Sequence, residues 1–445
     1  MTALSTAPSH APAGPVRFGG AVAAPGARLA AQAGLAALTL SAAHLVAPTF
    51  GHALPVAAVR AVGTGALAVM LAPRLAVEIA SAFGLLALAL GDPTPTYAGY
   101  HVTLVGLLFL CRRRGWTLAL ALALGAVVVP KTLFWLCSGR PDVHGWLNEP
   151  ALAVTIFATI YWWRETRDGR APALEAGRSP LAAWCLLYLF PSQIAVPLVL
   201  GPGDLWRARR DDAGAVLRAL ASFVAKAAAL VTLRALFPNH GFSCHSGAAL
   251  ASLPRPALWG VVALSYVDLM LTLSGTIDIA VAVARLYGWQ LPAPFRWALL
   301  AWNPVELWRR WGIYNRRFLL KNVYFPLGGG ARHRLLNVML TFLASALVMH
   351  SGWLGSKYWA VGAGGWRDWS IYFGLQGAAV CACLITWRLV GKDSAADREL
   401  RWSWGRLAGT LATQAMSALL HVIILPQAIP LGDRWRLIAR CLGLR

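Results

Sequence analysis

The amino-acid sequence predicts an all-α membrane protein with about 10 to 12 transmembrane or re-entrant helices. Of its 445 residues, 58% are hydrophobic and only 13% are charged, and the mean hydropathy is +0.57. A soluble protein of this length needs far more charge to cover its surface. The apolar residues also fall into windows long enough to cross a bilayer, which takes about 20 residues.

The predicted helices follow one another without an internal repeat and without a soluble domain between them. Residues 1–27 are rich in Ala, Pro, Gly and Ser and are expected to be disordered. They lack the pattern of a secretory signal, so the first membrane segment is expected to direct insertion. Residues 28–445 are expected to form a single multi-helix membrane domain. Its apolar windows lie at 28–50, 55–73, 75–91, 97–111, 116–137, 147–163, 181–200, 214–237, 256–289, 335–354, 368–390 and 405–428.

Two of these windows are not expected to be simple crossings. The window 181–200 lies between two arginine-rich loops and contains Pro191 and Pro197, so a re-entrant hairpin is predicted there. The window 256–289 is too long for one span, and a break is predicted at Ser274–Gly275.

The net charge of +22 does not by itself indicate nucleic acid, and none is expected as a partner. Arginines placed between apolar runs are typical of loops on the cytoplasmic side of a membrane. The same charge could attract anionic membrane lipids or an anionic donor such as a CoA thioester. The arginine clusters are Arg112–Arg114, Arg164–Arg178, Arg207–Arg210, Arg309–Arg317 and Arg398–Arg406.

Neither cysteine nor histidine spacing predicts a metal site. The seven cysteines show no regular framework. The segment Asn239–His245 contains three possible ligands, but no second cluster follows at zinc-site spacing. We therefore expect no metal and no tightly bound cofactor.

Residues 295–322 are too polar to cross the bilayer and are predicted to form an amphipathic helix at its surface. At 100° per residue, Trp308, Trp311, Asn315, Phe318 and Asn322 share one face, and the basic residues share the opposite face. The basic set is Arg309, Arg310, Arg316, Arg317 and Lys321. Both a membrane-surface anchor and a donor-binding role fit this pattern.

Asp268 and Asp278 lie in an apolar run, where an acid costs about 2.5–3.5 kcal/mol on insertion scales. They are expected to face a polar cavity or to pair with an arginine such as Arg285 or Arg296. A structural ion pair and a catalytic role are both open.

His350 stands near the end of the apolar window 335–354. The helix is expected to begin at the arginine-rich loop around Arg332 and Arg334, which puts His350 roughly 20 Å above its start. There an imidazole is tolerable only in a water-filled or substrate-filled cavity. A neutral imidazole suits a general base that takes a proton from a hydroxyl. A hydrogen-bonded core histidine is the alternative.

Several motifs, in one order, resemble those of the membrane-bound O-acyltransferase family, most clearly over 262–377. Leu307 replaces Phe in the Phe-Trp-Arg-Arg-Trp motif, and Gln376 stands where the last motif usually has His. The matching segments are Phe190–Pro197, Tyr266–Asp278, Asn303–Trp311, Pro326–Gly329 (Pro-Leu-Gly-Gly) and Trp369–Gly377.

The resemblance implies a core over about 181–390 in which helices surround a central tunnel, placed in the inner (cytoplasmic) membrane. It implies an acyl thioester donor from the cytoplasm and a hydroxyl of a polysaccharide or lipid as acceptor. His350 stands at the family's near-invariant histidine, the expected base. The residues expected to bind substrate are Trp308, Trp311, Arg309, Arg310, Asp268, Asp278 and Asn303.

Two departures from the family pattern stand out. The family usually has His, Asn or Asp after the second Trp of the block, as a second polar catalytic residue, and this chain has Gly312. Asn315, one turn on, is the expected substitute. The chain as a whole resembles bacterial members of the alginate O-acetylating and D-alanyl-transferring type, with some features of lipid-modifying members. Around His350 it reads Val-Met-His-Ser-Gly where bacterial polysaccharide-acetylating members read Leu-Trp-His-Gly, and Ser345–Ala346 resembles lipid-modifying members.

The leading hypothesis is transfer of an acyl group, first of all acetyl, to a hydroxyl of an envelope or secreted polysaccharide. Transfer of a longer chain to a lipid or alcohol is the alternative. A transporter and an inactive scaffold of the same fold are the rival classes, although a transporter usually shows internal symmetry, and none is visible.

Overall fold

The computed structural model describes residues 213–286, 293–346, 366–390, 403–424 and 429–444. Within these ranges the chain forms helices joined by short loops, without a strand. The windows predicted before residue 213, including the re-entrant hairpin at 181–200, lie outside the described residues, as do His350 and the disordered segment expected at 1–27.

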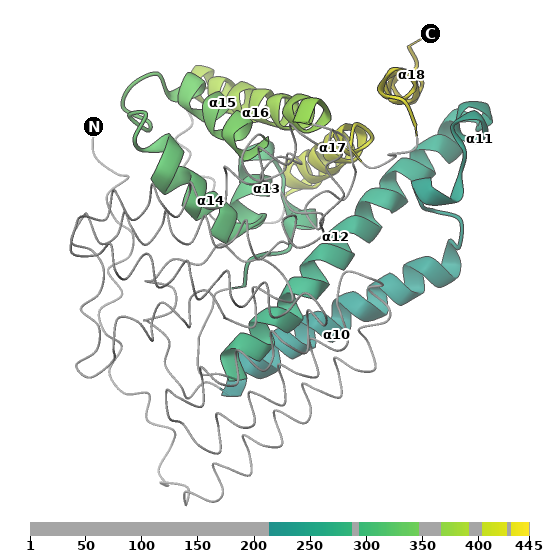
Figure 1. Ribbon diagram of the computed structural model, residues 1–445, viewed down its shortest axis with the longest axis horizontal. Helices are drawn as coiled ribbons and strands as arrows, with labels where there is room; N and C mark the ends of the chain where they lie inside the picture. Colours follow the sequence, from purple (N-terminus) through teal and green to yellow (C-terminus); the bar gives the residue numbers. More distant parts are fainter. Residues whose placement is uncertain (1–212, 287–292, 347–365, 391–402, 425–428, 445) are drawn as a thin grey trace, which may run out of the picture.

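Two long helices, α10 and α12, form a hairpin and lie side by side along most of their length (Figure 1). Their connection runs through two short helical turns. The bounds are α10 Ala213–Leu236, η4 Phe242–Cys244, α11 Gly247–Ser252 and α12 Arg255–Leu286.

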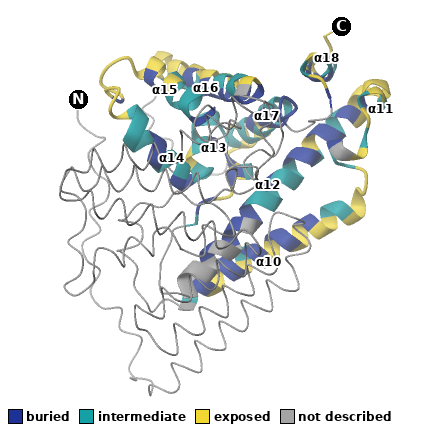
Figure 2. Ribbon diagram, in the orientation of Figure 1, coloured by how far each residue is buried: buried dark blue, intermediate teal, exposed yellow. Residues whose placement is uncertain are grey.

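α10 has one buried face and one exposed face, and both are apolar (Figure 2). Helical spacing at three and four residues places the buried side chains in one stripe. An exposed face made of apolar side chains is typical of a helix that faces lipid rather than water. The buried set is Val216, Ala219, Leu220, Phe223, Ala227 and Leu230; the exposed set includes Leu217, Val224 and Val231.

The second part of the fold is a layer of helices beside the upper half of α12 (Figure 1). α15 and α16 pack closely, because Gly377 has no side chain: a Cβ there would meet Met339 Sδ and Phe342 Cβ at 3.1 Å. α17 contacts both α12 and α16. The bounds are η5 Ala298–Leu300, α13 Pro304–Arg310, α14 Ile313–Leu319, the π-helical turn η6 Leu320–Tyr324, α15 Arg334–Ala344, α16 Trp366–Leu389, α17 Trp404–His421 and α18 Leu431–Leu442.

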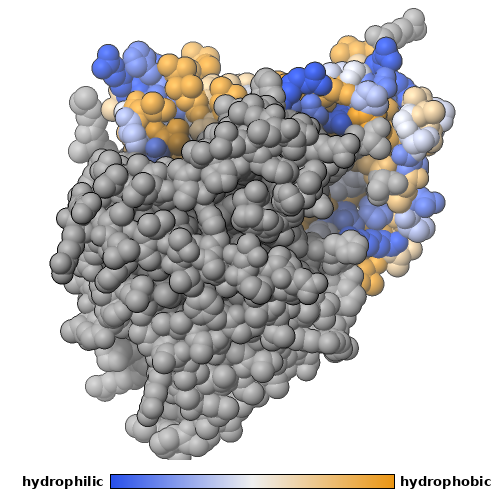
Figure 3. Space-filling model, viewed as in Figure 1, coloured by the Kyte–Doolittle hydropathy of each residue, from blue (hydrophilic) through white to orange (hydrophobic). Residues whose placement is uncertain are grey.

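Three of the described helices are long and apolar enough to cross a membrane: Val216–Leu236, Arg255–Gly275 and Arg367–Leu389. Apolar side chains also reach the surface over α15 and α16, where orange atoms are visible in Figure 3. Leu336 and Leu389, for example, are 56% and 81% exposed. The protein is therefore a helical membrane protein, as its composition predicted.

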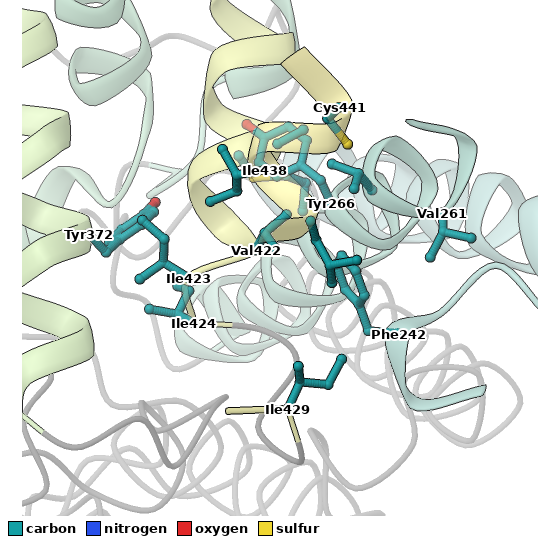
Figure 4. Packing of buried hydrophobic residues seen from close by; sticks show 14 of the residues in the cluster. Phe242, Val261, Tyr266, Tyr372, Val422, Ile423, Ile424, Ile429, Ile438 and Cys441 are labelled. Atoms are coloured by element: carbon teal, nitrogen blue, oxygen red, sulfur yellow. The ribbon is translucent and has the colours of Figure 1, made fainter. Parts of the chain in front are cut away.

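One core joins the two parts (Figure 4). Tyr266 of α12 and Tyr372 of α16 meet Val422, Ile423 and Ile424, which follow α17 directly. The amphipathic helix α18, which the apolar windows did not predict, closes this core from the C-terminal side through residues such as Ile438 and Cys441.

Hydrogen bonds from arginine to backbone carbonyls attach α18. Arg434 is 4% exposed; its Nε donates to Ile429 O at 2.7 Å and its Nη1 to Asp368 Oδ2 at 2.9 Å. Arg440 donates to Leu250 O and Leu253 O at 3.1 and 2.7 Å. These bonds tie the end of the chain to α16 and to the loop before α12.

The helices begin close to the predicted windows, but the predicted break at Ser274–Gly275 is wrong. α12 continues unbroken through both residues to Leu286. Both are buried, and Ser274 Oγ bonds back to Leu271 O at 3.5 Å. The packing against α10 thus overrides the weak helix propensity of Ser and Gly, which costs only about 1 kcal/mol.

The two intramembrane acids form ion pairs with cations of α10. Asp278 Oδ2 accepts from Lys226 Nζ and from Ser222 Oγ, each at 2.6 Å, and both charged side chains are almost fully buried. Asp268 accepts from Arg234 Nε at 2.7 Å and lies 3.0 Å from His240 Nε2. Asp268 thus has an arginine partner, as predicted, but it is Arg234 and not Arg296, because the sequence does not reveal which helix lies alongside α12. The side chain of Arg285 lies outside the described residues.

We expect Lys226 and Asp278 to stabilise the hairpin only as a pair. Lys226→Met or Asp278→Asn alone should lower the free energy of unfolding by roughly 3–5 kcal/mol, because each leaves a buried charge uncompensated. The double variant Lys226→Met/Asp278→Leu should recover most of the loss. Thermal unfolding in detergent measures this, with Asp433→Asn, which breaks the exposed pair with Arg436, as a control near wild type. Single variants as stable as wild type would contradict the pairing.

Candidate active site

The Trp-Arg-Arg-Trp block forms the short helix α13, whose start is fixed by its own sequence. Asn303 Oδ1 accepts from the backbone N–H of Glu306 at 2.8 Å, and Pro304 follows in the first turn. This is an N-cap with proline in the position it favours. Asn303, predicted to bind substrate, thus has a structural partner in the protein.

Glu306 binds the two arginines of the block. Its carboxylate accepts from Arg310 Nε at 2.9 Å and pairs with Arg309 Nη1 at 3.2 Å. Arg310 also donates to Arg296 O and lies over the Trp302 ring, 5.1 Å from its centroid. Arg309 is the more exposed of the two, so it is the one whose guanidinium can still reach a ligand.

Gly312 ends this helix, so the single amphipathic helix predicted over 295–322 is wrong. Its φ of +54° lies in the left-handed region, and α14 begins immediately afterwards. Nothing approaches within 4 Å of a Cβ at this position except Asn315 Cβ, at 4.0 Å. The glycine is therefore required by backbone conformation and not by crowding.

The aromatic face of the block packs into the helix layer. The Trp308 ring meets Phe342 of α15 edge-on, with centroids 5.1 Å apart, and lies 5.7 Å from Phe373 of α16. Trp311 meets Phe295 edge-on at 4.6 Å. Such contacts fix both indoles against the protein, so Trp308 and Trp311 do not act as free membrane anchors.

Trp308 also begins a chain of buried polar groups. Its Nε1 donates to Oε1 of Gln376 at 3.2 Å. Gln376 is fully buried, and no hydrogen bond of good geometry reaches its Nε2. A buried amide held at one end and open at the other is rare enough to count as a candidate functional group.

The same helix carries Tyr372, one turn before Gln376, and Tyr372 meets His421 of α17. His421 Nδ1 lies 2.6 Å from Ser417 O, which can only accept, so this nitrogen carries the proton. Nε2 therefore accepts from the Tyr372 hydroxyl at 3.1 Å. His421 is a neutral imidazole with both nitrogens engaged. Sequence analysis missed it, although the argument applied to His350, a histidine in an apolar run, applies equally here.

Asn337 shapes the Pro-Leu-Gly-Gly loop. It is 3% exposed, and its Nδ2 lies within 3.0 Å of the carbonyl oxygens of Leu327, Gly329 and Arg332. The loop turns through Gly328 and Gly329, both with positive φ. One amide on α15 thus holds the loop over the start of the helix that leads to His350 in the sequence.

The predicted site residues fall into three groups. Trp308, Trp311, Arg309 and Arg310 share α13 and its end, and Trp308 reaches α15 and α16. Asn315 lies half-buried on α14, and among the described residues its amide makes no hydrogen bond. The carboxylates of Asp268 and Asp278 are bound to α10, and His350 lies outside the described residues.

No group of three or more His, Cys, Asp or Glu side chains within the described ranges is arranged to hold a metal ion. In the loop after α10, His240 bonds Phe237 O and Asp268, and His245 Nε2 bonds Asn239 O at 2.8 Å. These side chains act as hydrogen-bonding groups of the loop.

Comparison with known proteins shows that one segment of this chain is similar to a family. Residues 251–355 match the model of the membrane-bound O-acyltransferase (MBOAT) family. The matched segment contains the Trp-Arg-Arg-Trp block, the Pro-Leu-Gly-Gly loop and His350. The predicted resemblance to this family is confirmed. The match ends before Trp369–Gly377, which the motif order had included.

The chain is also similar to the peptidoglycan O-acetyltransferase of Helicobacter pylori (strain ATCC 700392 / 26695), at 34% identity over 97 residues. The shared stretch covers 21% of this chain and 18% of the relative. The similarity is thus concentrated in about a fifth of each protein, and the MBOAT segment is the part that the comparisons establish.

The left-handed conformation of Gly312 predicts an ordering among its variants. Gly312→Ala should cost about 1–2 kcal/mol, since a Cβ disfavours this region. Gly312→Asn should cost less, because asparagine enters it more readily. Thermal unfolding in detergent would rank the two. Gly374→Ala on α16, where a Cβ meets nothing within 4 Å, is the control and should be neutral or stabilising. Equal stability of Gly312→Ala and wild type would contradict the conformation.

Proposed function

We propose that this protein is a membrane-embedded O-acyltransferase that moves an acyl group, first of all acetyl, from a cytoplasmic thioester to a hydroxyl of an envelope or secreted polysaccharide. The observation that carries the proposal is the match of residues 251–355 to the MBOAT model, and the similarity of a 97-residue stretch to a peptidoglycan O-acetyltransferase supports it. A multi-pass location in the inner membrane goes with it.

In the proposed reaction, His350 is the general base. The acceptor hydroxyl attacks the thioester carbonyl as its proton passes to the neutral imidazole. The new C–O bond forms, the C–S bond breaks, and the leaving thiolate takes the proton from the imidazolium. Acyl ester and free thiol are the products, and no other reactant is needed.

The negative charge on the carbonyl oxygen needs a donor in the transition state. Glycine at position 312 has no side chain that could donate this hydrogen bond, and we propose that the amide of Asn315 donates it instead. Its half-buried amide is free of hydrogen bonds within the described residues, which supports this role. Gln376, with its open Nε2 next to Trp308, is a second amide suited to the same task.

Two observations favour functions other than acetyl transfer to a polysaccharide. Gly312 itself favours a scaffold of the same fold without activity, because the usual polar residue is missing. Ser345–Ala346 ahead of His350 favours a longer acyl chain and a lipid or alcohol acceptor, the pattern of lipid-modifying members. Each has its own outcome in the assay below.

Purified protein, supplied with isotope-labelled acetyl-CoA or long-chain acyl-CoA, should transfer label to a hydroxyl acceptor. Peptidoglycan fragments, other polysaccharides and lipid alcohols, offered separately, identify the acceptor by mass spectrometry. His350→Ala should lose roughly 10²–10⁴-fold of the rate, the range for a general base. Asn315→Ala should lose about 10²-fold or more in kcat, as for an oxyanion donor.

Arg436→Gln, an exposed substitution on α18, is the matched control and should keep the wild-type rate. Equal product from wild type and His350→Ala would remove His350 from the mechanism. An inert wild type that gains no activity as Gly312→Asn or Gly312→His would support the inactive scaffold and overturn the proposal.

A further inference from the structure

Arg316 of α14 forms no ion pair within the described residues. The side chain is half-buried, its Nε is enclosed, and that N–H donates to nothing. An enclosed guanidinium without an acceptor is costly, because water that would solvate it has been removed. No described side chain supplies the acceptor, so an anion bound at the accessible part of the guanidinium would offset this cost.

The surroundings of Arg316 are positive. Burial lowers the pKa of Arg316, and the neighbouring charges of Arg309, Arg317 and Arg296 lower it further; Glu306 opposes them. Glu306 is already engaged by Arg309 and Arg310. A single carboxylate therefore faces an excess of guanidinium groups, and an anion placed beside Arg316 would relieve their repulsion.

Backbone hydrogen bonds bring the segment of Arg296 beside the Trp-Arg-Arg-Trp block. Arg296 N–H donates to Arg310 O, and Ile313 N–H donates to Pro294 O, each at 3.0 Å. These bonds lay the segment before η5 alongside the junction of α13 and α14. The junction itself turns at Gly312, which redirects α14, and the buried Tyr314 and Phe318 anchor that helix on either side of Arg316.

We propose that Arg316, with Arg296, Arg309 and Arg317, forms a binding site for a phosphate-bearing anion. Guanidinium groups bind phosphate oxygens through paired N–H donors, and they remain charged in a half-buried position where lysine would lose its proton more readily. Two sources carry this chemistry: the nucleotide phosphates of a thioester donor and the headgroup phosphate of an anionic lipid. The site needs no turnover, so it stands whether or not the proposed acyl transfer occurs.

The full-length protein in nanodiscs of zwitterionic lipid is titrated with adenosine 3′,5′-bisphosphate or with pyrophosphate, and binding is measured by calorimetry. Wild type should bind at least one of them, with an affinity that falls as salt rises. Arg316→Gln should weaken binding at least about tenfold, as expected for a lost charge-assisted pair. Arg316→Lys should recover only part, since it keeps the charge without the paired donors.

Arg436→Gln is the control, because Arg436 is 83% exposed and lies on α18; its binding should equal wild type. Without ligand, Arg316→Gln should unfold at the same or a higher temperature than wild type, since an enclosed unpaired charge has been removed. If Arg316 has only a structural role, Arg316→Gln should be less stable than wild type, and Arg316→Lys should bind the anion as tightly as wild type. That result would overturn the proposal.

A parallel titration of the protein with phosphatidylglycerol nanodiscs separates the two sources. Binding of the bisphosphate in zwitterionic discs assigns the site to a nucleotide donor; an Arg316-dependent preference for phosphatidylglycerol alone assigns it to lipid. Absence of both, or equal binding by wild type and Arg316→Gln, overturns the site. If Arg316→Gln loses anion binding but transfers the acyl group at the wild-type rate, Arg316 belongs to an anion site that does not bind the acyl donor.

Discussion

Charged groups inside an apolar helix bundle are costly without partners, and two buried pairs in this protein join side chains of different helices. Lys226 of α10 meets Asp278 of α12, and Arg434 of α18 meets Asp368 of α16. Since an unpaired charge or amide in such surroundings costs several kcal/mol, each contact fixes one helix relative to another more sharply than apolar packing does. These pairs fix α12 against α10, and α16, which carries Gln376, against α18.

The turn at Gly312 is the second constraint. Because the chain enters the left-handed region there, the block splits into α13, which packs its tryptophans against α15 and α16, and α14, which carries Asn315 and Arg316 in a new direction. A polar side chain at position 312 would extend from the same turn. Its absence removes one group while leaving the geometry around it intact, so the amides of Asn315 and Gln376 lie where compensation is possible.

Within the described residues, the sequence predicted the long helices well and their contacts poorly. Apolar windows located α10, α12, α15, α16 and α17, because length and hydropathy alone decide what can cross a bilayer. The partners of Asp268 and Asp278 were not predictable, since they depend on which helix lies alongside. The sequence shows that Gly312 lacks the polar side chain expected at this position. Its left-handed backbone conformation, by contrast, is visible only in the structure. α18 was missed because it is short and charged, and only burial of Arg434 reveals that it belongs to the core.

The same reasoning narrows the choice of base. A general base needs a ring nitrogen that is free to take a proton. Both nitrogens of His421 are already bonded, to Ser417 O and to the Tyr372 hydroxyl, and both nitrogens of His240 are bonded as well. His245 is tied to Asn239 O, and His333 lies exposed at the start of α15, away from the buried polar groups. None of the described histidines therefore lies inside the bundle with a free ring nitrogen, and the proposal that His350 is the base rests on the motif that contains it.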